Sequence, residues 1–394
     1  MVAVEHYVTF GQSLPDGSQG APSISTVEEV SNAFIYVLAG TRANALRSAT
    51  IQRPYISMGY RIAAASPGKI FGFSTHALSG QSIAQLSKGG SSGRYEQMLT
   101  TITNAHAAEV AAGNTHTVPW INFFQGEADQ TFGTTRADYR ARFLQLKADF
   151  TADVMAATGQ VTPPKWMINQ TATWAHYENA PSIGLEQVDM ARTIPNVWCV
   201  GGQYQLPYAD GLHMNNVGYY YMGEMIGRAI NAVNAGGAWK PFAPSAITAT
   251  AGGLEVTYDV PVGSLVLDTA LIAQQPSYGF SLAGTAATIT GVSLTGASTV
   301  TITTDRPVTE STARLGYGVT ANNGSVGLGN LRDSNASLSG YDGSPLPDFA
   351  LHLSDAFTPF PTEEPDRPQV MYRVTGWSYV GPSGLVPLTI VPAT

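Results

Sequence analysis

The hydrophobic and polar positions of the first 240 residues alternate between two kinds of segment. Short, continuously apolar runs predict strands at residues 4–10, 69–74, 118–124, 165–169 and 196–201. Segments with apolar residues three and four positions apart predict helices at residues 92–112, 135–157 and 215–234. Strands that alternate with helices predict an α/β fold, with a doubly wound, mostly parallel sheet flanked by helices. In such sheets the functional site lies at the carboxyl ends of the strands.

The pattern changes near residue 240, where the chain runs Trp-Lys-Pro-Phe-Ala-Pro. Beyond this point the helical spacing disappears, and Leu254, Val256 and Tyr258 alternate with polar residues as in half-buried strands. Gly-rich turns separate further short strands. We therefore expect a first domain over residues 1–240 and a β-rich, sandwich-like domain over residues 245–394.

Composition predicts a folded protein and argues against a nucleic-acid partner and a membrane span. Of the 394 residues, 44% are hydrophobic, which is enough for a buried core, and only 12% are charged. The formal net charge of -8 repels phosphate backbones, so we expect no nucleic-acid partner. The single cysteine, Cys199, excludes a disulfide within the chain. No apolar run reaches the ~18 residues that a membrane span needs.

The N-terminal residues do not have the basic region and apolar run of a signal peptide. The sequence leaves open a cytosolic chain, a processed chain, and export by a route that needs no signal peptide, such as a phage particle. Among the locations that remain, the sequence slightly favours an extracellular or phage-associated one.

The first candidate for chemistry is Ser13, which follows the first predicted strand in the sequence Phe10-Gly11-Gln12-Ser13. Gly11 permits a tight turn and a close approach of the backbone. A serine in this turn would direct its hydroxyl off the carboxyl edge of the sheet. Such a hydroxyl is a weak nucleophile and needs a base. The motif alone is also that of a common turn.

Asp210 and His213 lie directly before the last predicted helix of the first domain. A carboxylate three residues before an imidazole can bond one ring nitrogen and leave the other free to accept the serine proton. The alternative is an aspartate that caps the helix beside a surface histidine.

A polar and acidic cluster, Gln125-Gly126-Glu127-Ala128-Asp129, follows the third predicted strand. Such a cluster is costly at the end of an apolar strand unless it is used or fully hydrogen-bonded. Gln125 offers an amide donor for an oxyanion. The alternatives are a helix cap and an ion site. Because all three segments follow strands of one predicted sheet, we expect them to converge on one edge.

Four ordered blocks resemble those of the SGNH (GDSL-like) hydrolase superfamily: Gly-Gln-Ser at 11–13, Ser-Gly-Gln-Ser at 79–82, Gln-Gly-Glu-Ala-Asp at 125–129 and Asp-Gly-Leu-His at 210–213. They are most similar to the sialate O-acetylesterase and carbohydrate-esterase branch, over residues 6 to about 235. The resemblance implies a flavodoxin-like SGNH fold. It also implies a serine esterase that removes short acyl groups, usually acetate, from a sugar. No metal and no organic cofactor are implied.

By the same resemblance, Ser13 is the nucleophile, His213 is the base and Asp210 is the acid that orients the base. The N–H groups of Ser13 and Gly80 would form the oxyanion hole together with the Gln125 side chain. Leu14 departs from the branch, which often carries asparagine at this position.

Gln12, Glu127 and His76 are candidate supporting residues. Glu127 is a rival of Asp210 for the acid role, or it bonds the turn that holds Ser13. The short spacing between Asp210 and His213 favours Asp210. His76 either lines the pocket or packs as a loop histidine.

Two other functions compete with a sugar-ester deacetylase. One is a general short-chain carboxylesterase, and the other is a non-catalytic glycan-binding or phage tail structural protein. The complete set of Ser13, Asp210 and His213 favours an enzyme, whose expected partner is a small-molecule or glycan ester. The β-rich domain would bind sugar, form the interface of a homo-oligomer or cover the flank of the first domain.

Overall fold

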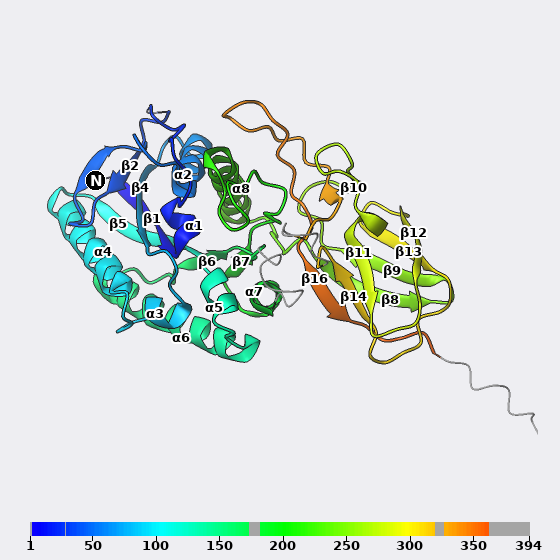
Figure 1. The fold of residues 1–394 in the computed structure, drawn as a ribbon. Coiled ribbons are helices and arrows are strands. Elements are labelled where there is room, and N and C mark those ends of the chain that lie inside the picture. Colours follow the sequence, from blue (N-terminus) through cyan, green and yellow to red (C-terminus); the bar gives the residue numbers. More distant parts are fainter. Residues whose placement is uncertain (1, 28, 173–181, 320–326, 362–394) are drawn as a thin grey trace, which may run out of the picture.

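The computed structural model describes residues 2–27, 29–172, 182–319 and 327–361 (Figure 1). Its N-terminal part is built on a seven-stranded sheet in the order β3-β2-β4-β1-β5-β6-β7. Neighbouring strands are parallel, except that β3 runs antiparallel to β2. The strands are β1 (Ala3–Gly11), β2 (Ala33–Tyr36), β3 (Arg42–Ala45), β4 (Ile70–Ala77), β5 (Thr115–Phe124), β6 (Lys165–Ile168) and β7 (Val197–Cys199). The mostly parallel sheet predicted from the sequence is confirmed.

Helices cover both faces of this sheet (Figure 1). Tyr7 packs in one apolar cluster with α2 and α8, whereas its neighbour Val8 packs in a second cluster with α4 and α6. This division follows from the strand, in which successive side chains point to opposite faces. The helices are α1 (Ser13–Asp16), α2 (Pro54–Ala65), α3 (Ile83–Leu86), α4 (Arg94–Ala111), α5 (Glu127–Thr131), α6 (Arg136–Thr158), α7 (Ser182–Thr193) and α8 (Asn216–Asn234). None of the helices in the described ranges is both long and apolar enough to cross a membrane.

The five predicted strands and three predicted helices of this part are all present. The sequence analysis missed β2, β3, α2 and α7, and also the short helices α1, α3 and α5. Most of α2 is buried, from Pro54 at its start to Ala63 in its last turn.

The strands after residue 243 form three antiparallel sheets in the described residues, in the orders β12-β13-β9-β8, β11-β14-β16 and β10-β15. They form a lobe of their own in Figure 1. The strands are β8 (Pro244–Thr250), β9 (Gly253–Tyr258), β10 (Leu265–Leu267), β11 (Phe280–Ala283), β12 (Ile289–Leu294), β13 (Thr299–Thr304), β14 (Arg314–Tyr317), β15 (Leu331–Asp333) and β16 (Leu353–Ala356). The expected β-rich character is confirmed, and the domain boundary between residues 240 and 245 stays a prediction.

Polar contacts fasten the β-rich part to the α/β part. Arg228 of α8 pairs with Asp348 at 2.8 Å. Gln170, which follows β6, donates through Nε2 to the carbonyl oxygen of His352 and accepts the N–H of the same residue, both at 2.8 Å. These contacts come from α8 and from the end of β6. None of them involves β1 or β4.

Candidate active site

Ser13 begins α1 directly after β1, at the carboxyl edge of the sheet. The turn is built by close contact between strand ends: the N–H of Gln12 donates to the Phe124 carbonyl at 3.2 Å, and the N–H of Leu78 donates to the Gly11 carbonyl at 3.1 Å. Gly11 has φ +145°, and a Cβ there would lie 2.0 Å from the Phe124 oxygen. Only glycine fits this position, because any side chain would separate β1 from β5. The strand ends therefore fix the backbone that carries Ser13.

Asp210 and His213 form a pair in the loop before α8. His213 Nδ1 lies 3.0 Å from Asp210 Oδ2. The other carboxylate oxygen of Asp210 accepts the N–H groups of Leu212, at 2.7 Å, and of His213. Burial alone would raise the pKa of Asp210, but the hydrogen bonds from His213 and Leu212 outweigh it and hold the pKa below its ordinary value. An ionised carboxylate at Nδ1 keeps the proton on that nitrogen and leaves Nε2 as the acceptor.

Tyr219 ties the helix that follows His213 to the turn that carries Ser13. Its hydroxyl donates to the carbonyl oxygen of Ser18 at 2.7 Å. Burial raises the pKa of Tyr219, and the nearby carboxyls of Glu127 and Asp210 raise it further. Tyr219 therefore joins α8, the helix after His213, to the loop that follows the Ser13 helix. The sequence analysis did not identify Tyr219, since it lies within the apolar stripe of a helix and carries no separate signal.

Ser13 is 2% exposed, and within the described residues no hydrogen bond joins its hydroxyl to His213. Hydrogen bonds between a nucleophile and its base are often long in a free enzyme and shorten when substrate binds. Among the described residues, no hydrogen bond is formed by the N–H of Ser13 or of Gly80. Gly80 has φ +73° and open space where a Cβ would stand. Both N–H groups are thus available to a ligand.

The side chains of two glutamines connect the turns around Ser13. Gln12 Oε1 accepts the N–H of Ala128 at 3.2 Å and, more weakly, that of Gly126 at 3.4 Å, so this side chain holds the start of α5. Gln125 Nε2 donates to the Gln81 carbonyl at 3.3 Å and to Asp129. Both amide hydrogens of Gln125 are therefore engaged, and the structure does not aim them at an oxyanion as expected. Gln125 instead supports the segment that contains Gly80.

Asp129 is a further organising residue of the same turn, which the sequence analysis noted only as part of its motif. Its carboxylate accepts the N–H of Ile83 at 2.7 Å and the hydroxyl of Thr134 at 2.8 Å, in addition to the Gln125 amide. It is fully buried, and each of its bonds reaches a different segment. A buried carboxylate is tolerated because these donors compensate its lost hydration.

Glu127 is buried beside Asp129, and neither of its carboxyl oxygens has a hydrogen-bond partner among the described residues. The expectation that Glu127 bonds the turn holding Ser13 is wrong in this structure, since Gln12 makes the bonds between the two turns. Burial, with a smaller contribution from Asp129, raises the pKa of the Glu127 carboxyl to about 7. A carboxyl without donors in a buried place favours its neutral form.

His76 does not lie in a loop or line the site. It belongs to β4, is buried, and bonds Ser74 Oγ through Nε2 at 3.1 Å. Burial, with a smaller contribution from the positive charge of Arg94, lowers its pKa to about 3. Its strand position directs it under α4, where it packs as a neutral core histidine. The prediction that His76 supports the site is therefore corrected.

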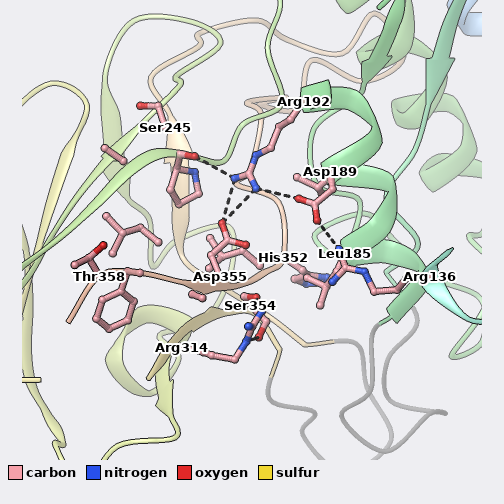
Figure 2. Close-up of a pocket in the computed structure, with 17 residues that line it drawn as sticks. Arg136, Leu185, Asp189, Arg192, Ser245, Arg314, His352, Ser354, Asp355 and Thr358 are labelled. Carbon is pink, nitrogen blue, oxygen red and sulfur yellow. Dashed lines mark hydrogen bonds and ion pairs between the residues drawn. The ribbon is translucent and has the colours of Figure 1, made fainter. Parts of the chain in front are cut away.

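The described residues contain no cluster of three or more His, Cys, Asp or Glu side chains suited to a metal ion. A cavity of about 510 Å³ lies away from the three segments, between α7, β8 and β16 (Figure 2). Arg192 bonds Asp189 and Asp355 there, at 3.3 Å each, and Arg136 bonds Asp189 (Figure 2). Neither Ser13 nor His213 lines this cavity.

A family model described as "Carbohydrate esterase, sialic acid-specific acetylesterase" matches residues 32–232. The matched region includes Gly80, Gln125, Asp210 and His213, and it begins after Ser13. No curated protein matches the chain.

Solved structures of low sequence identity are similar to the chain. A carbohydrate acetylesterase from Xanthomonas citri is 16% identical, with a TM-score of 0.57, over 87% of this chain and 79% of that one. An acetylxylan esterase from Geobacillus stearothermophilus is 12% identical, with a TM-score of 0.36, over 61% of this chain and 97% of that one. A protein from Arabidopsis thaliana is 15% identical, with a TM-score of 0.45, over 58% of this chain and 98% of that one. At 16% identity, the similarity to the Xanthomonas citri enzyme shows the fold alone, which is that of the SGNH esterases.

Glu127→Gln tests the environment of the buried carboxyl. A pKa raised from 4.5 to about 7 in the folded protein means that the folded state binds more protons than the unfolded state between these pH values. The stability that this carboxyl contributes is therefore full below pH 4.5 and is lost as the pH rises through 7. Relative to wild type, the glutamine variant should gain about 3 kcal/mol in the free energy of unfolding between pH 4.5 and pH 8.

Urea unfolding of both proteins at several pH values measures this difference. Glu255→Gln, at an exposed position of β9, is the matched control and should give the pH dependence of wild type. A difference between Glu127→Gln and wild type that stays constant with pH would show that Glu127 is ionised throughout.

Proposed function

Because the chain belongs to the carbohydrate esterases of the sialic acid-specific acetylesterase family, we propose that it hydrolyses O-acetyl esters of carbohydrates with Ser13 as the nucleophile. It is an SGNH-type esterase by family and fold. The observation that carries the assignment of residues is the pairing of His213 Nδ1 with Asp210 at 3.0 Å. The pair lies in the loop directly before α8, and Tyr219 of α8 bonds the loop that follows the Ser13 helix. This pairing supports a triad of Ser13, His213 and Asp210.

Acylation begins with the Ser13 hydroxyl. His213 Nε2 takes the proton from Oγ while Oγ forms a bond to the ester carbonyl carbon. The oxygen of that carbonyl becomes an oxyanion, and the N–H groups of Ser13 and Gly80 donate to it. When the tetrahedral intermediate collapses, the bond to the sugar oxygen breaks and His213 returns the proton to this oxygen. The sugar leaves as a free alcohol, and Ser13 carries the acetyl group.

Deacylation repeats these steps with water. His213 takes a proton from water as its oxygen attacks the acetyl carbon, and the same two N–H groups stabilise the second oxyanion. The bond to Ser13 Oγ then breaks, Oγ regains its proton from His213, and acetate leaves. Asp210 remains ionised throughout and stabilises the imidazolium that forms twice in each cycle. Gln12 and Gln125 do not touch the reacting atoms in this scheme, and they hold the turns that carry the donors.

Ser13→Ala tests the proposed nucleophile. We expect the variant to lose at least about 10³-fold in kcat for p-nitrophenyl acetate, since only the oxyanion donors and binding remain. Acetate release from acetylated xylan, acetylated pectin and O-acetylated sialic acid should fall in parallel. Ser293→Ala, at an exposed serine of β12, is the control and should leave both reactions unchanged.

An unchanged rate in Ser13→Ala would exclude Ser13 as the nucleophile. The range of wild-type substrates separates the remaining hypotheses. Hydrolysis of p-nitrophenyl acetate and butyrate with no acetate released from any acetylated saccharide would identify a general short-chain carboxylesterase. A wild-type protein without any esterase activity would favour a glycan-binding or structural role.

Asp210→Asn and Glu127→Gln together identify the acid of the triad. Asparagine at 210 no longer fixes the proton on His213 Nδ1, so kcat should fall by about 10²–10⁴-fold. Glutamine at 127 leaves the His213 pairing intact, so we expect a loss of less than about tenfold. Steady-state kinetics with p-nitrophenyl acetate give both values, and a larger loss in Glu127→Gln than in Asp210→Asn would assign the acid role to Glu127.

A further inference from the structure

Ser18 makes three hydrogen bonds, and each reaches a different segment of the proposed site. Its N–H donates to the Ser13 carbonyl at 3.1 Å. Its carbonyl accepts the hydroxyl of Tyr219 at 2.7 Å. Its hydroxyl lies 3.0 Å from the hydroxyl of Ser79, the residue before Gly80. The bonds therefore connect the nucleophile turn, the helix after the base and the oxyanion segment.

The contact with Ser79 is important because Gln125 holds this segment only at Gln81, and residues 78–80 themselves make few other hydrogen bonds. Ser79 and Gly80 are both exposed, and nothing packs where a Cβ of Gly80 would stand. For residues 78–80 of the described chain, the only other hydrogen bond formed by a side chain or N–H donor is that of Leu78 to Gly11. The Gly80 N–H can aim at an oxyanion only if this short segment keeps its orientation relative to Ser13.

We propose that Ser18 is a positioning residue, which sets the Gly80 N–H and the helix that follows His213 relative to Ser13. The proposal rests on the function proposed above. Ser18 itself does not contact the reacting atoms. The backbone bonds of Ser18 persist when its side chain changes, so the hydroxyl bond to Ser79 is the part that substitution can remove. Its loss would let the Gly80 N–H move away from the developing oxyanion.

Ser18→Ala and Ser79→Ala are expected to lower kcat for p-nitrophenyl acetate by about three- to tenfold, as the loss of one hydrogen bond does. The KM should change less than about twofold, because the oxyanion forms after the substrate binds. The double variant should lose no more than either single variant, since both remove the same bond. Ser18→Thr keeps a hydroxyl and should retain wild-type kcat.

Thr295→Ala is the matched control, because it removes a similar hydroxyl pair, that of Thr295 and Thr301 at 2.9 Å, within the β-rich part. It should leave kcat unchanged. Thermal unfolding of every variant checks that the fold is kept. Wild-type kcat in Ser18→Ala, or losses that multiply in the double variant, would overturn the positioning role. Ser13→Ala separates the two proposals: if it abolishes turnover while Ser18→Ala has no effect, only the role of Ser18 fails.

Discussion

The site depends on the close approach of β1 to β5 at Gly11. There the two backbones are too near for any side chain, and the N–H of Gln12 bonds the Phe124 carbonyl directly. This contact forces the chain to turn at once, so Ser13 starts a short helix at the edge of the sheet. The same edge receives Gln125 and the start of α5 from the end of β5. A single backbone constraint thus places the nucleophile turn and the acidic turn side by side.

Hydrogen bonds of buried polar groups then hold these turns in place. Asp129 satisfies its carboxylate with donors from three segments, whereas Glu127, two residues away, has none among the described residues. Burial without hydrogen-bond donors favours the neutral form of Glu127 and raises its pKa to about 7. Asp210 follows the first pattern, with two N–H donors and the His213 ring. The carboxyl that we propose to orient the base is therefore the one whose pKa the hydrogen bonds of its own loop keep low.

The sequence predicted the parts of this arrangement that depend on local spacing. The pair of Asp210 and His213 is three residues apart, so a turn alone brings them together. Five of the seven strands of the sheet were also recognisable, because their apolar runs are continuous, whereas the short strands β2 and β3 were not. The direction of the His76 side chain could not be predicted from the sequence. One register position in β4 decides whether this side chain faces the site or the core under α4.

The hydrogen-bond partners of the glutamines could not be predicted either, because they lie on other segments of the chain. Gln125 gives its amide to the Gln81 carbonyl and to Asp129, and the first of these lies 44 residues away along the chain. Tyr219 likewise gains its role only when α8 packs against the loop after α1. Such contacts exist only in the assembled fold, so the spacing of residues along the sequence does not reveal them.

The central claim is that Ser13 carries the acyl group during turnover. Rapid mixing of the protein with p-nitrophenyl acetate, followed by acid quench and mass spectrometry of its peptides, tests this directly. The account predicts an acetyl group on the peptide that contains Ser13, which appears within the first turnover and is absent in Ser13→Ala. Steady hydrolysis without this adduct, or an acetyl group on another residue that forms and decays at the rate of turnover, would contradict it.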